Sequence, residues 1–323
     1  MNRRQLLPVL VAPFVLRPAG AAQAQQTFPN RPIRLVVPFP PGGSNDAIGR
    51  PLAAEIGQTL GQPVVVDNKG GAGSTIGTAE VVRAAADGYT LLCTSSSFAT
   101  SAAVQSTPYN AERDLAMVAL VATSPLVMLA SPAFPANTMA EAIAYIRGNP
   151  GKVDYGSGGI GSIGHMSGAL FAQKAGLDMQ HVPYRGTGPV MNDLLTDTIQ
   201  LTFTTATATA GLISSGRVKV LGWTAENRPA NGPTAPTPRE SGLPDYEAQI
   251  WWGVLGRRDL PEDIRTRING AVNTALGGGA LARGLVNEGA QPRPLSPEEG
   301  DRFMLADLGR WKALAASANI RMD

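Results

Sequence analysis

The sequence predicts an α/β fold built from two lobes. Short runs of β-branched and aliphatic residues alternate with stretches long enough for a crossover helix, and this alternation is typical of parallel-rich sheets covered by helices. The chain has 323 residues, of which 43% are hydrophobic and 16% charged, so it can bury more core than one domain needs. From residue 261 onward the pattern is helical, which adds a helical C-terminal segment.

Ten segments are expected to form strands. They are 33–37, 63–68, 89–94, 117–122, 126–130, 152–157, 179–184, 199–204, 218–223 and 250–255. In sheets of this kind, ligands bind beyond the carboxyl ends of the strands. We therefore expect functional residues directly after these segments.

A helix is expected after the first strand, because Ile48, Leu52, Ile56 and Leu60 recur every four residues and form one apolar face. Pro51 lies inside this segment and predicts a kink, since proline has no backbone N–H to donate.

Capping signals mark further helices. Thr138 and Glu141 form a capping box before a helix that Gly148 ends, and Ser296 and Glu299 form a second box. In the C-terminal segment, apolar residues recur at helical spacing at 264, 268, 272 and 276, and again at 304, 308, 311 and 315. A buried stripe explains these positions better than a ligand site does.

Residues 1–24 read as a signal peptide. A basic start is followed by an apolar stretch over 6–16 and by small residues that predict cleavage near Ala24. Arg3 and Arg4 leave both general secretion and twin-arginine export open. Without Arg3, Arg4 and Arg17 the formal net charge falls from +2 to −1, and no basic stripe points to nucleic acid. Export to the periplasm is the expectation.

The stretch "PFPPGGSNDAIGR", residues 38–50, is the first candidate binding loop. Its prolines fix φ, Gly42 and Gly43 permit a sharp turn, and Ser44 is expected to cap the following helix. A helix N-terminus leaves about four backbone N–H groups unpaired and carries roughly half a positive charge, so it can hold a carboxylate without lysine or arginine. The alternative reading is a capped turn in which Asp46 only complements the helix dipole.

Two roles are open for Asp46, direct ligand contact and shaping of the loop. An ionised carboxylate repels an anionic ligand, so we predict that Asp46 orients the backbone amides of the loop instead.

Further loops rich in small donors follow other strands. The segment "KGGAGSTIG" lacks the spacing of a phosphate-binding P-loop. Ser95–Ser97 follow the third predicted strand, Ser157 and Ser162 lie around the sixth, and Thr204 and Thr205 end the eighth. Together these loops favour a pocket for a small anion.

A glycine motif supplies the main alternative. Gly156, Gly158 and Gly161 satisfy G-x-G-x-x-G between a strand and a helix, as a dinucleotide site requires. The next strand ends in Tyr184 and Arg185 rather than in an acidic residue, and Arg185 would suit a 2′-phosphate. An NADP-dependent oxidoreductase using residues 156–164 therefore stays open.

Signals for catalysis or metal binding are weak. The sequence has no G-x-S-x-G motif, and neither histidine stands in a recognisable triad order. We interpret His165 as a cap or pocket wall, His181 as structural and Cys93 as a buried small hydrophobe that excludes an intramolecular disulfide. Two histidines and one cysteine are too few for zinc. We expect a non-enzymatic protein with no cofactor and no metal.

Five ordered segments resemble the Bug-type substrate-binding proteins of tripartite tricarboxylate transporters. They are "RPIRLVVPFPPGGSNDAIGR", "GQPVVVDNKGGAGSTIGTAEVVRAAADGYTLL", "DYGSGGIGSIGHMSGALF", "HVPYRGTGPVMNDLL" and "PRESGLPDYEAQIWWGVL". The likeness runs from about Phe28 to the C-terminus. It implies a two-lobed periplasmic binding protein of the Venus-flytrap, type II-like class, which closes over a small carboxylate and delivers it to a membrane permease. We expect a monomer, and the same properties fit the partner of a sensor.

The resemblance also implies where the ligand binds. The family's first binding loop falls on Phe39–Asp46, its hydroxyl-rich strand end on Ser95–Ser97, and its opposing loop on Ser157–His165. The expected ligand-binding set is Phe39, Gly43, Ser44, Asn45, Asp46, Ser95, Ser96, Ser157, Gly161, Ser162, His165 and Thr204.

The chain also departs from the family pattern. Thr196 and Asp197 stand where the family usually has a Gly-Gly turn, and a threonine-rich stretch follows Thr204. We assign residues 28–124 plus 224–323 to the first lobe and 125–223 to the second, with two crossings between them as the hinge.

Overall fold

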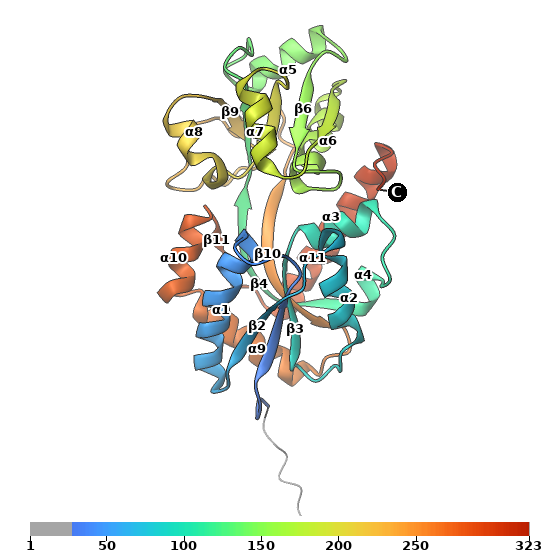
Figure 1. Cartoon of the computed structure of the whole chain (residues 1–323), viewed down its shortest axis with the longest axis vertical. Coiled ribbons are helices and arrows are strands. Elements are labelled where there is room, and N and C mark those ends of the chain that lie inside the picture. The colour runs from blue at the N-terminus through green and yellow to red at the C-terminus, as the bar shows by residue number, and fades with distance from the viewer. Residues whose placement is uncertain (1–27, 323) are drawn as a thin grey trace, which may run out of the picture.

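The structure of the chain is a computed structural model that describes residues 28–322, and it contains two sheets, one above the other (Figure 1). The predicted signal peptide lies outside the described residues. The strands are β1 Ile33–Val37, β2 Val64–Asn68, β3 Thr90–Ser95, β4 Leu115–Pro125, β5 Val127–Ala130, β6 Asp154–Ser157, β7 Gln180–Pro183, β8 Leu201–Thr204, β9 Lys219–Trp223, β10 Gln249–Arg257 and β11 Gln291–Pro292. Each of the ten predicted strands is present, and β11 was not predicted.

The helices lie between these strands and after them. They are α1 Ser44–Leu60, α2 Thr75–Arg83, α3 Ser97–Val104, α4 Ala111–Asp114, α5 Met139–Gly148, α6 Ile163–Ala175, α7 Thr187–Leu195, α8 Ala210–Ser214, α9 Glu262–Ala275, α10 Gly279–Asn287 and α11 Pro297–Ser317, with short 3₁₀ turns η1 Ala72–Ser74 and η2 Thr207–Thr209.

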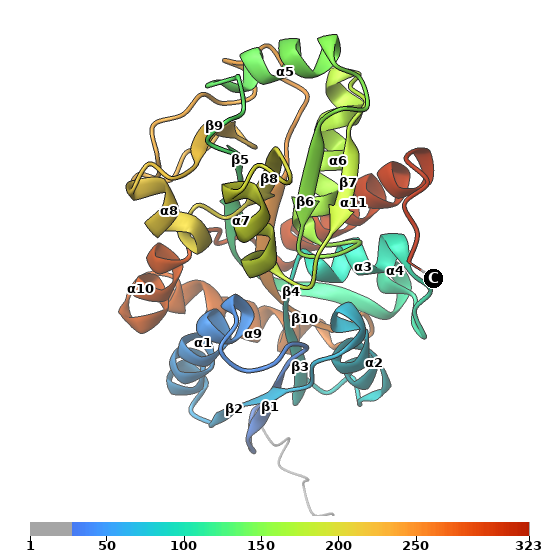
Figure 2. The same ribbon diagram turned by 45° about the horizontal axis from the view of Figure 1, so that its top comes forward.

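The first lobe is built on a six-stranded sheet with the order β11-β4-β10-β3-β1-β2. Helices cover both of its faces: α1, α9 and α10 pack on one, and α2, α3 and α11 on the other. The second lobe has a five-stranded sheet with the order β7-β6-β8-β5-β9 and carries α5–α8. Figure 2 shows the two lobes from a tilted view, with α7 and β8 lying above α1.

The expectation of parallel-rich sheets is wrong, because both sheets mix parallel and antiparallel pairs. β2, β1 and β3 are parallel, and so are β7, β6 and β8. In contrast, β10 is antiparallel to β3 and β4, and β5 is antiparallel to β8 and β9. The reason lies in the connections: β4 leaves the first lobe and β10 re-enters it, so these two neighbours must run in opposite directions.

The two crossings between the lobes differ greatly in length. Only Leu126 separates β4 from β5, whereas residues 224–248 connect β9 to β10. Part of the long segment packs on the second sheet, where the Pro236 carbonyl accepts the Trp223 backbone N–H at 2.8 Å. The assignment of 28–124 plus 224–323 and 125–223 to the two lobes stays a prediction.

Thr224 fastens the two crossings to each other. Its side-chain oxygen accepts the Leu126 backbone N–H at 2.8 Å and donates to the Ala248 carbonyl at 2.7 Å. Its backbone N–H donates to the Leu126 carbonyl, and its own carbonyl accepts the Ala248 N–H. Thr224 is fully buried, so water does not compete for these bonds.

Helix α1 differs from the prediction at its start. The residue at the N-cap position is Gly43, not Ser44, and no side chain caps the helix. The Gly43 carbonyl accepts the N–H groups of Asp46 and Ala47, so Ser44 is already helical. The helix continues through Pro51 to Leu60 as a single element, and its predicted apolar face is buried.

The two predicted capping boxes have different outcomes. At α11, Ser296 and Glu299 form the complete box, and Pro297 is the first helical residue. At α5, the Thr138 hydroxyl accepts the Glu141 N–H, but the Glu141 carboxylate accepts the N–H of Asn137 instead of that of Thr138. The α5 box is therefore only half formed.

The conformation and contact of Asp197 show what this residue offers where the sequence departs from the expected Gly-Gly turn. Its φ is +60°, in the left-handed region that favours glycine. Its carboxylate accepts a hydrogen bond from the Ser131 hydroxyl, which lies at the end of β5. The side chain thus offers a contact that glycine could not make in the same backbone conformation.

Candidate functional site

A cavity of about 440 Å³ lies between the two lobes and is the candidate ligand site. Its walls come from both lobes, and its floor comes from the strands that cross between them. The first lobe contributes Ser44, Asn287 and Glu288; the second contributes Gly158, Ser162–Gly164, Thr187, Val190, Thr202–Thr205, Thr207 and Ala208; and the floor is Leu126 with Ile250.

Three helices begin at this cavity. Ser44 is the first residue of α1, Ser162 is the N-cap of α6, and Thr187 is the first residue of α7. Each N-terminus presents unpaired backbone N–H groups and about half a positive charge. No lysine or arginine is found among the described residues that line the cavity. The groups there that suit a small anion are therefore the backbone N–H dipoles.

Asp46 organises the loop that precedes α1. Its carboxylate accepts the Gly42 backbone N–H at 3.0 Å, the Asn68 side-chain amide at 3.0 Å and the Arg50 guanidinium at 2.9 Å. Burial by itself would raise the pKa of Asp46, but these three donors outweigh it and hold the pKa below its usual value. Asp46 is therefore ionised, and its charge is satisfied inside the loop.

The Asn68 side chain joins this network to the rest of the loop. It donates to the Phe39 carbonyl at 3.1 Å as well as to Asp46, and its oxygen accepts from Arg50 at 2.9 Å. Neither Phe39 nor Asp46 lines the cavity. Both act on the backbone of the loop, which carries Ser44 to the cavity wall.

The predicted row of hydroxyl groups lies deeper in the first lobe. The Asn45 amide donates to the Ser95 hydroxyl at 3.4 Å, and Ser95 in turn bonds Ser97 at 3.1 Å. Asn45, Ser95 and Ser96 are all buried. Within the described residues, the side-chain oxygen of Asn45 and the Ser96 hydroxyl have no hydrogen-bond partner. These residues lie behind Ser44 rather than on the cavity surface.

A pair of stacked histidines supports the opposing loop in the second lobe. The His165 Nδ1 accepts the Gly161 backbone N–H at 3.1 Å, so its ring proton lies on Nε2. His181 Nε2 lies 2.7 Å from the Ser157 hydroxyl, which also donates to the Gly159 carbonyl. Loop 158–162 is thereby held at both ends, and its Gly158 and Ser162 face the cavity.

Both histidine rings are neutral near pH 7. Burial lowers the pKa of His165 to about 4. Burial, together with the neighbouring His165, lowers the pKa of His181 to about 3. A neutral pair adds no charge beside the cavity, which agrees with the interpretation of His165 as a wall residue and of His181 as structural.

Of the residues expected to bind the ligand, three line the cavity: Ser44, Ser162 and Thr204. The others are not among its lining residues, and these are Phe39, Gly43, Asn45, Asp46, Ser95, Ser96, Ser157, Gly161 and His165. The binding role of all twelve stays a prediction.

Several lining residues were not predicted. Thr187 follows β7 and could have been found by the same rule that led to Ser162. Asn287 and Glu288 end α10 in the C-terminal segment, where the sequence shows only a helical pattern. Burial raises the pKa of Glu288 above its usual value.

The glycine-rich segment is explained by packing within the second lobe. A Cβ on Gly156 would meet the Ile199 side chain at 2.3 Å, and one on Gly164 would meet the Phe203 carbonyl oxygen at 2.6 Å. Arg185, which would have held a 2′-phosphate, is exposed and lies outside the cavity lining. No feature of residues 28–322 supports the NADP-dependent alternative.

Two other properties concern the described residues as a whole. Within residues 28–322 no helix is both long and apolar enough to cross a membrane. The same residues contain no group of three or more histidine, cysteine, aspartate or glutamate side chains placed to hold a metal ion. Cys93 is fully buried, as predicted, and burial raises the pKa of its thiol to about 12.

Comparison with known proteins gives a consistent result. Residues 48–320 match the model of the tripartite tricarboxylate transporter family receptor. Protein BugT of Bordetella pertussis is 33% identical over 325 residues, and the match covers 100% of both chains.

Solved structures of similar proteins carry ligands. Rpa4515 of R. palustris, described with adipate, is 31% identical, with a TM-score of 0.76 over 91% of this chain and 99% of that chain. MatC of Rhodopseudomonas palustris, described with bound malate, is 30% identical, with a TM-score of 0.73 over 89% of this chain and 99% of that one.

Proposed function

The chain belongs to the tripartite tricarboxylate transporter receptor family, whose members are solute-binding receptors, and we propose that it captures a carboxylate in the cavity between its lobes. The observation that carries this proposal is that three helix N-termini meet at one cavity. Among the described residues that line this cavity there is no lysine or arginine. The adipate and malate described for two similar proteins agree with it.

The carboxylate is held by backbone and hydroxyl donors. The N–H groups at the starts of α1, α6 and α7 surround it, and the hydroxyls of Thr204 and Thr205 supply further bonds. A hydrogen bond to a charged group contributes about 1.5–3 kcal/mol, roughly twice the value for a neutral pair. A few such bonds suffice for micromolar affinity.

Binding is coupled to closure of the two lobes. The ligand touches Ser44 from the first lobe and Ser162 and Thr187 from the second, so it makes more contacts when the walls approach each other. A ligand shifts a conformational equilibrium only through such a difference in affinity between the open and closed states.

The remaining assignments belong to the same proposal. The protein acts in the periplasm after cleavage near Ala24, works as a monomer, delivers its ligand to a membrane permease and catalyses no reaction. The leader pattern and the receptor family support this picture. Asp46 shapes the binding loop without touching the ligand, because its three donors already satisfy its charge.

A thermal-shift screen of mono-, di- and tricarboxylates tests the proposal. A ligand at 100 times its Kd should add about 2.7 kcal/mol of stability. Thr204→Val removes one hydroxyl from the cavity wall and should weaken the best carboxylate about tenfold. Thr59→Val, an exposed site on α1, is the matched control and should bind normally. A flat response to every carboxylate would contradict the proposal.

A further inference from the structure

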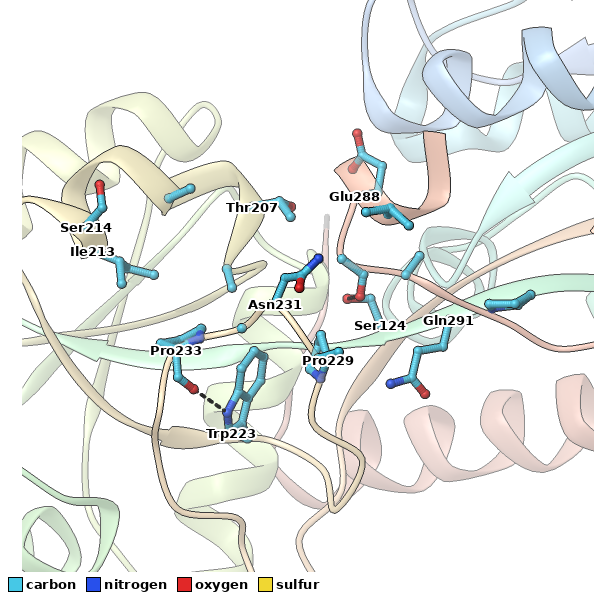
Figure 3. Close-up of a pocket in the computed structure, with 18 residues that line it drawn as sticks. Ser124, Thr207, Ile213, Ser214, Trp223, Pro229, Asn231, Pro233, Glu288 and Gln291 are labelled. Carbon is cyan, nitrogen blue, oxygen red and sulfur yellow. Dashed lines mark hydrogen bonds between the residues drawn. The ribbon is translucent and has the colours of Figure 1, made fainter. Parts of the chain in front are cut away.

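A second cavity of about 500 Å³ adjoins the candidate ligand site (Figure 3). Thr207 and Glu288 line both cavities, so the two meet between these residues. Figure 3 shows Ile213 and Ser214 on one side, Glu288 on the other, and Asn231 with Pro229 between them. The second cavity therefore lies where the second lobe, the long crossing segment and the end of α10 come together.

The walls of the second cavity are largely apolar. Ala206, Ala210 and Ile213 come from the second lobe, Val286 and Ala290 from the first, and three prolines add further apolar surface. Trp223 forms one wall, and its indole is fixed because Nε1 donates to the Pro233 carbonyl at 3.2 Å. A Cβ on Gly232 would meet the Trp223 ring at 2.4 Å, so the crossing segment packs directly on the indole.

Three polar residues of this cavity already donate hydrogen bonds to the protein, which leaves Thr207 and Asn231 as the amide and hydroxyl side chains without such a bond among the described lining residues. The Ser124 hydroxyl bonds the Gly289 carbonyl at 3.0 Å, and the Ser214 hydroxyl bonds the Gly211 carbonyl at 3.3 Å. The Gln291 amide bonds the Arg228 carbonyl at 3.4 Å. A carboxylate entering this cavity would find few free donors.

Glu288 makes the junction still less suitable for a second negative charge. It is the only ionisable side chain among the described residues that line the two cavities, and it is an acid. A dicarboxylate reaching past Thr207 would place its far carboxylate beside Glu288 or in the apolar cavity, where an unpaired charge is costly.

We propose that the ligand is an amphipathic monocarboxylate, whose carboxylate binds at the starts of α1, α6 and α7 while an apolar body of at least phenyl size occupies the second cavity. This inference rests on the proposed function of the first cavity and specifies its ligand class. The two volumes suit such a molecule, since ligand cavities typically span about 300–1,000 Å³ and a phenyl-sized ring fits a cavity of about 150 Å³.

Calorimetric titration with butyrate, 4-phenylbutyrate and adipate tests the inference on the full mature chain. Butyrate and 4-phenylbutyrate share one carboxylate and differ in the ring, so their ratio reports the second cavity. We expect 4-phenylbutyrate to bind at least about tenfold more tightly than butyrate, since burial of a phenyl ring exceeds the free energy of one tenfold step.

Two substitutions fill the second cavity and one serves as the control. Ala210→Phe and Val286→Trp should remove most of the advantage of 4-phenylbutyrate and leave butyrate within about twofold. Both sites are exposed, so at least one variant should fold. Ala280→Phe, an exposed alanine at the start of α10 that lines neither cavity, should change neither ligand.

Each contrary result is distinct. If 4-phenylbutyrate binds no better than butyrate, or if the filling variants weaken both ligands equally, the inference is wrong. Tighter binding of adipate than of 4-phenylbutyrate would overturn the inference and leave the proposed function intact. No binding of any of the three acids would overturn the inference, and a flat response to every carboxylate in the thermal-shift screen would overturn the proposed function as well.

Discussion

The rings of His165 and His181 stack face to face, with centroids 3.6 Å apart and planes inclined by 7°. The two residues come from α6 and β7, and together they support loop 158–162 through Gly161 and Ser157. Two protonated imidazoles could not share this contact without strong repulsion. The wall of the candidate ligand site therefore depends on a pair of rings that must stay neutral.

Acid should destabilise the protein through this pair. Both rings have a pKa of 6.5 in the unfolded chain, but about 4 for His165 and about 3 for His181 in the folded chain. The unfolded state therefore binds more protons between pH 6.5 and about 4, and stability falls as the pH falls through that window. The loss should approach about 1.4 kcal/mol per pH unit for each ring, measured by urea unfolding.

A variant with one histidine separates this effect from general acid unfolding. His181→Gln keeps a polar group near Ser157 and removes one of the two protonation sites. It should reduce the slope of stability against pH in this window by about half. Parallel curves for the wild type and the variant would show that the pair does not control acid stability.

Removal of the Asp46 carboxylate should damage the loop before α1. Asp46→Ala removes the acceptor of the Gly42 N–H and one of the two acceptors of the Asn68 amide, at a cost of about 1–3 kcal/mol. Carboxylate affinity should fall as well, because the loop no longer holds Ser44 in place. Glu112→Ala, which breaks an exposed ion pair with Lys312, should cost under about 1 kcal/mol. Unchanged folding and binding in Asp46→Ala would refute this role.

Even a replacement of Thr224 that keeps its shape should lower the stability of the protein. Thr224→Val keeps the shape of the side chain but leaves the buried Leu126 N–H unpaired, which should cost about 1–3 kcal/mol. Thr224→Ser keeps the hydroxyl and should retain most of the stability. Equal midpoints of urea unfolding for the two variants would mean that methyl packing, and not the hydrogen bond, stabilises the crossing.

Glu288 should oppose carboxylate binding at neutral pH. Glu288→Gln removes the only ionisable side chain among the described residues of the two cavities, so affinity for a carboxylate should rise by about two- to tenfold. Because burial raises the pKa of Glu288, the wild type becomes partly protonated as the pH falls, and the two affinities should converge as the pH is lowered from 7. A calorimetric difference that stays constant over this range would contradict the assignment.

The sequence predicted the strands well because each is a short apolar run with turn signals on both sides. It missed β11, whose two residues are too short to show a pattern. The direction of β10 and β5 was wrong, since antiparallel pairing here follows from two long-range crossings that no local pattern records. Ser44 was misplaced as a cap because Asp46 draws the loop backbone into a tight turn one residue earlier.

The candidate site was predictable only where it follows a strand. Ser162 lies in the loop that follows β6, and Thr204 is the last residue of β8. Ser44 begins the helix that follows β1. Asn287 and Glu288 reach the cavity from the end of a C-terminal helix, and only the packing of α10 on α1 brings them there. Local sequence carries no sign of that placement.

The hydrogen bonds of Thr224 also determine the point about which the two lobes can rotate. Any rotation of one lobe on the other about Leu126, Thr224 and Ala248 moves the nearby cavity floor least and the distant tips most. Val65 on β2 and Tyr145 on α5 are exposed by 55% and 38%, and they stand in different lobes (Figure 1). Cysteines introduced there can carry a pair of fluorescent dyes while buried Cys93 stays unlabelled. Single-molecule energy transfer would then report the swing of the lobes for each candidate acid, one molecule at a time.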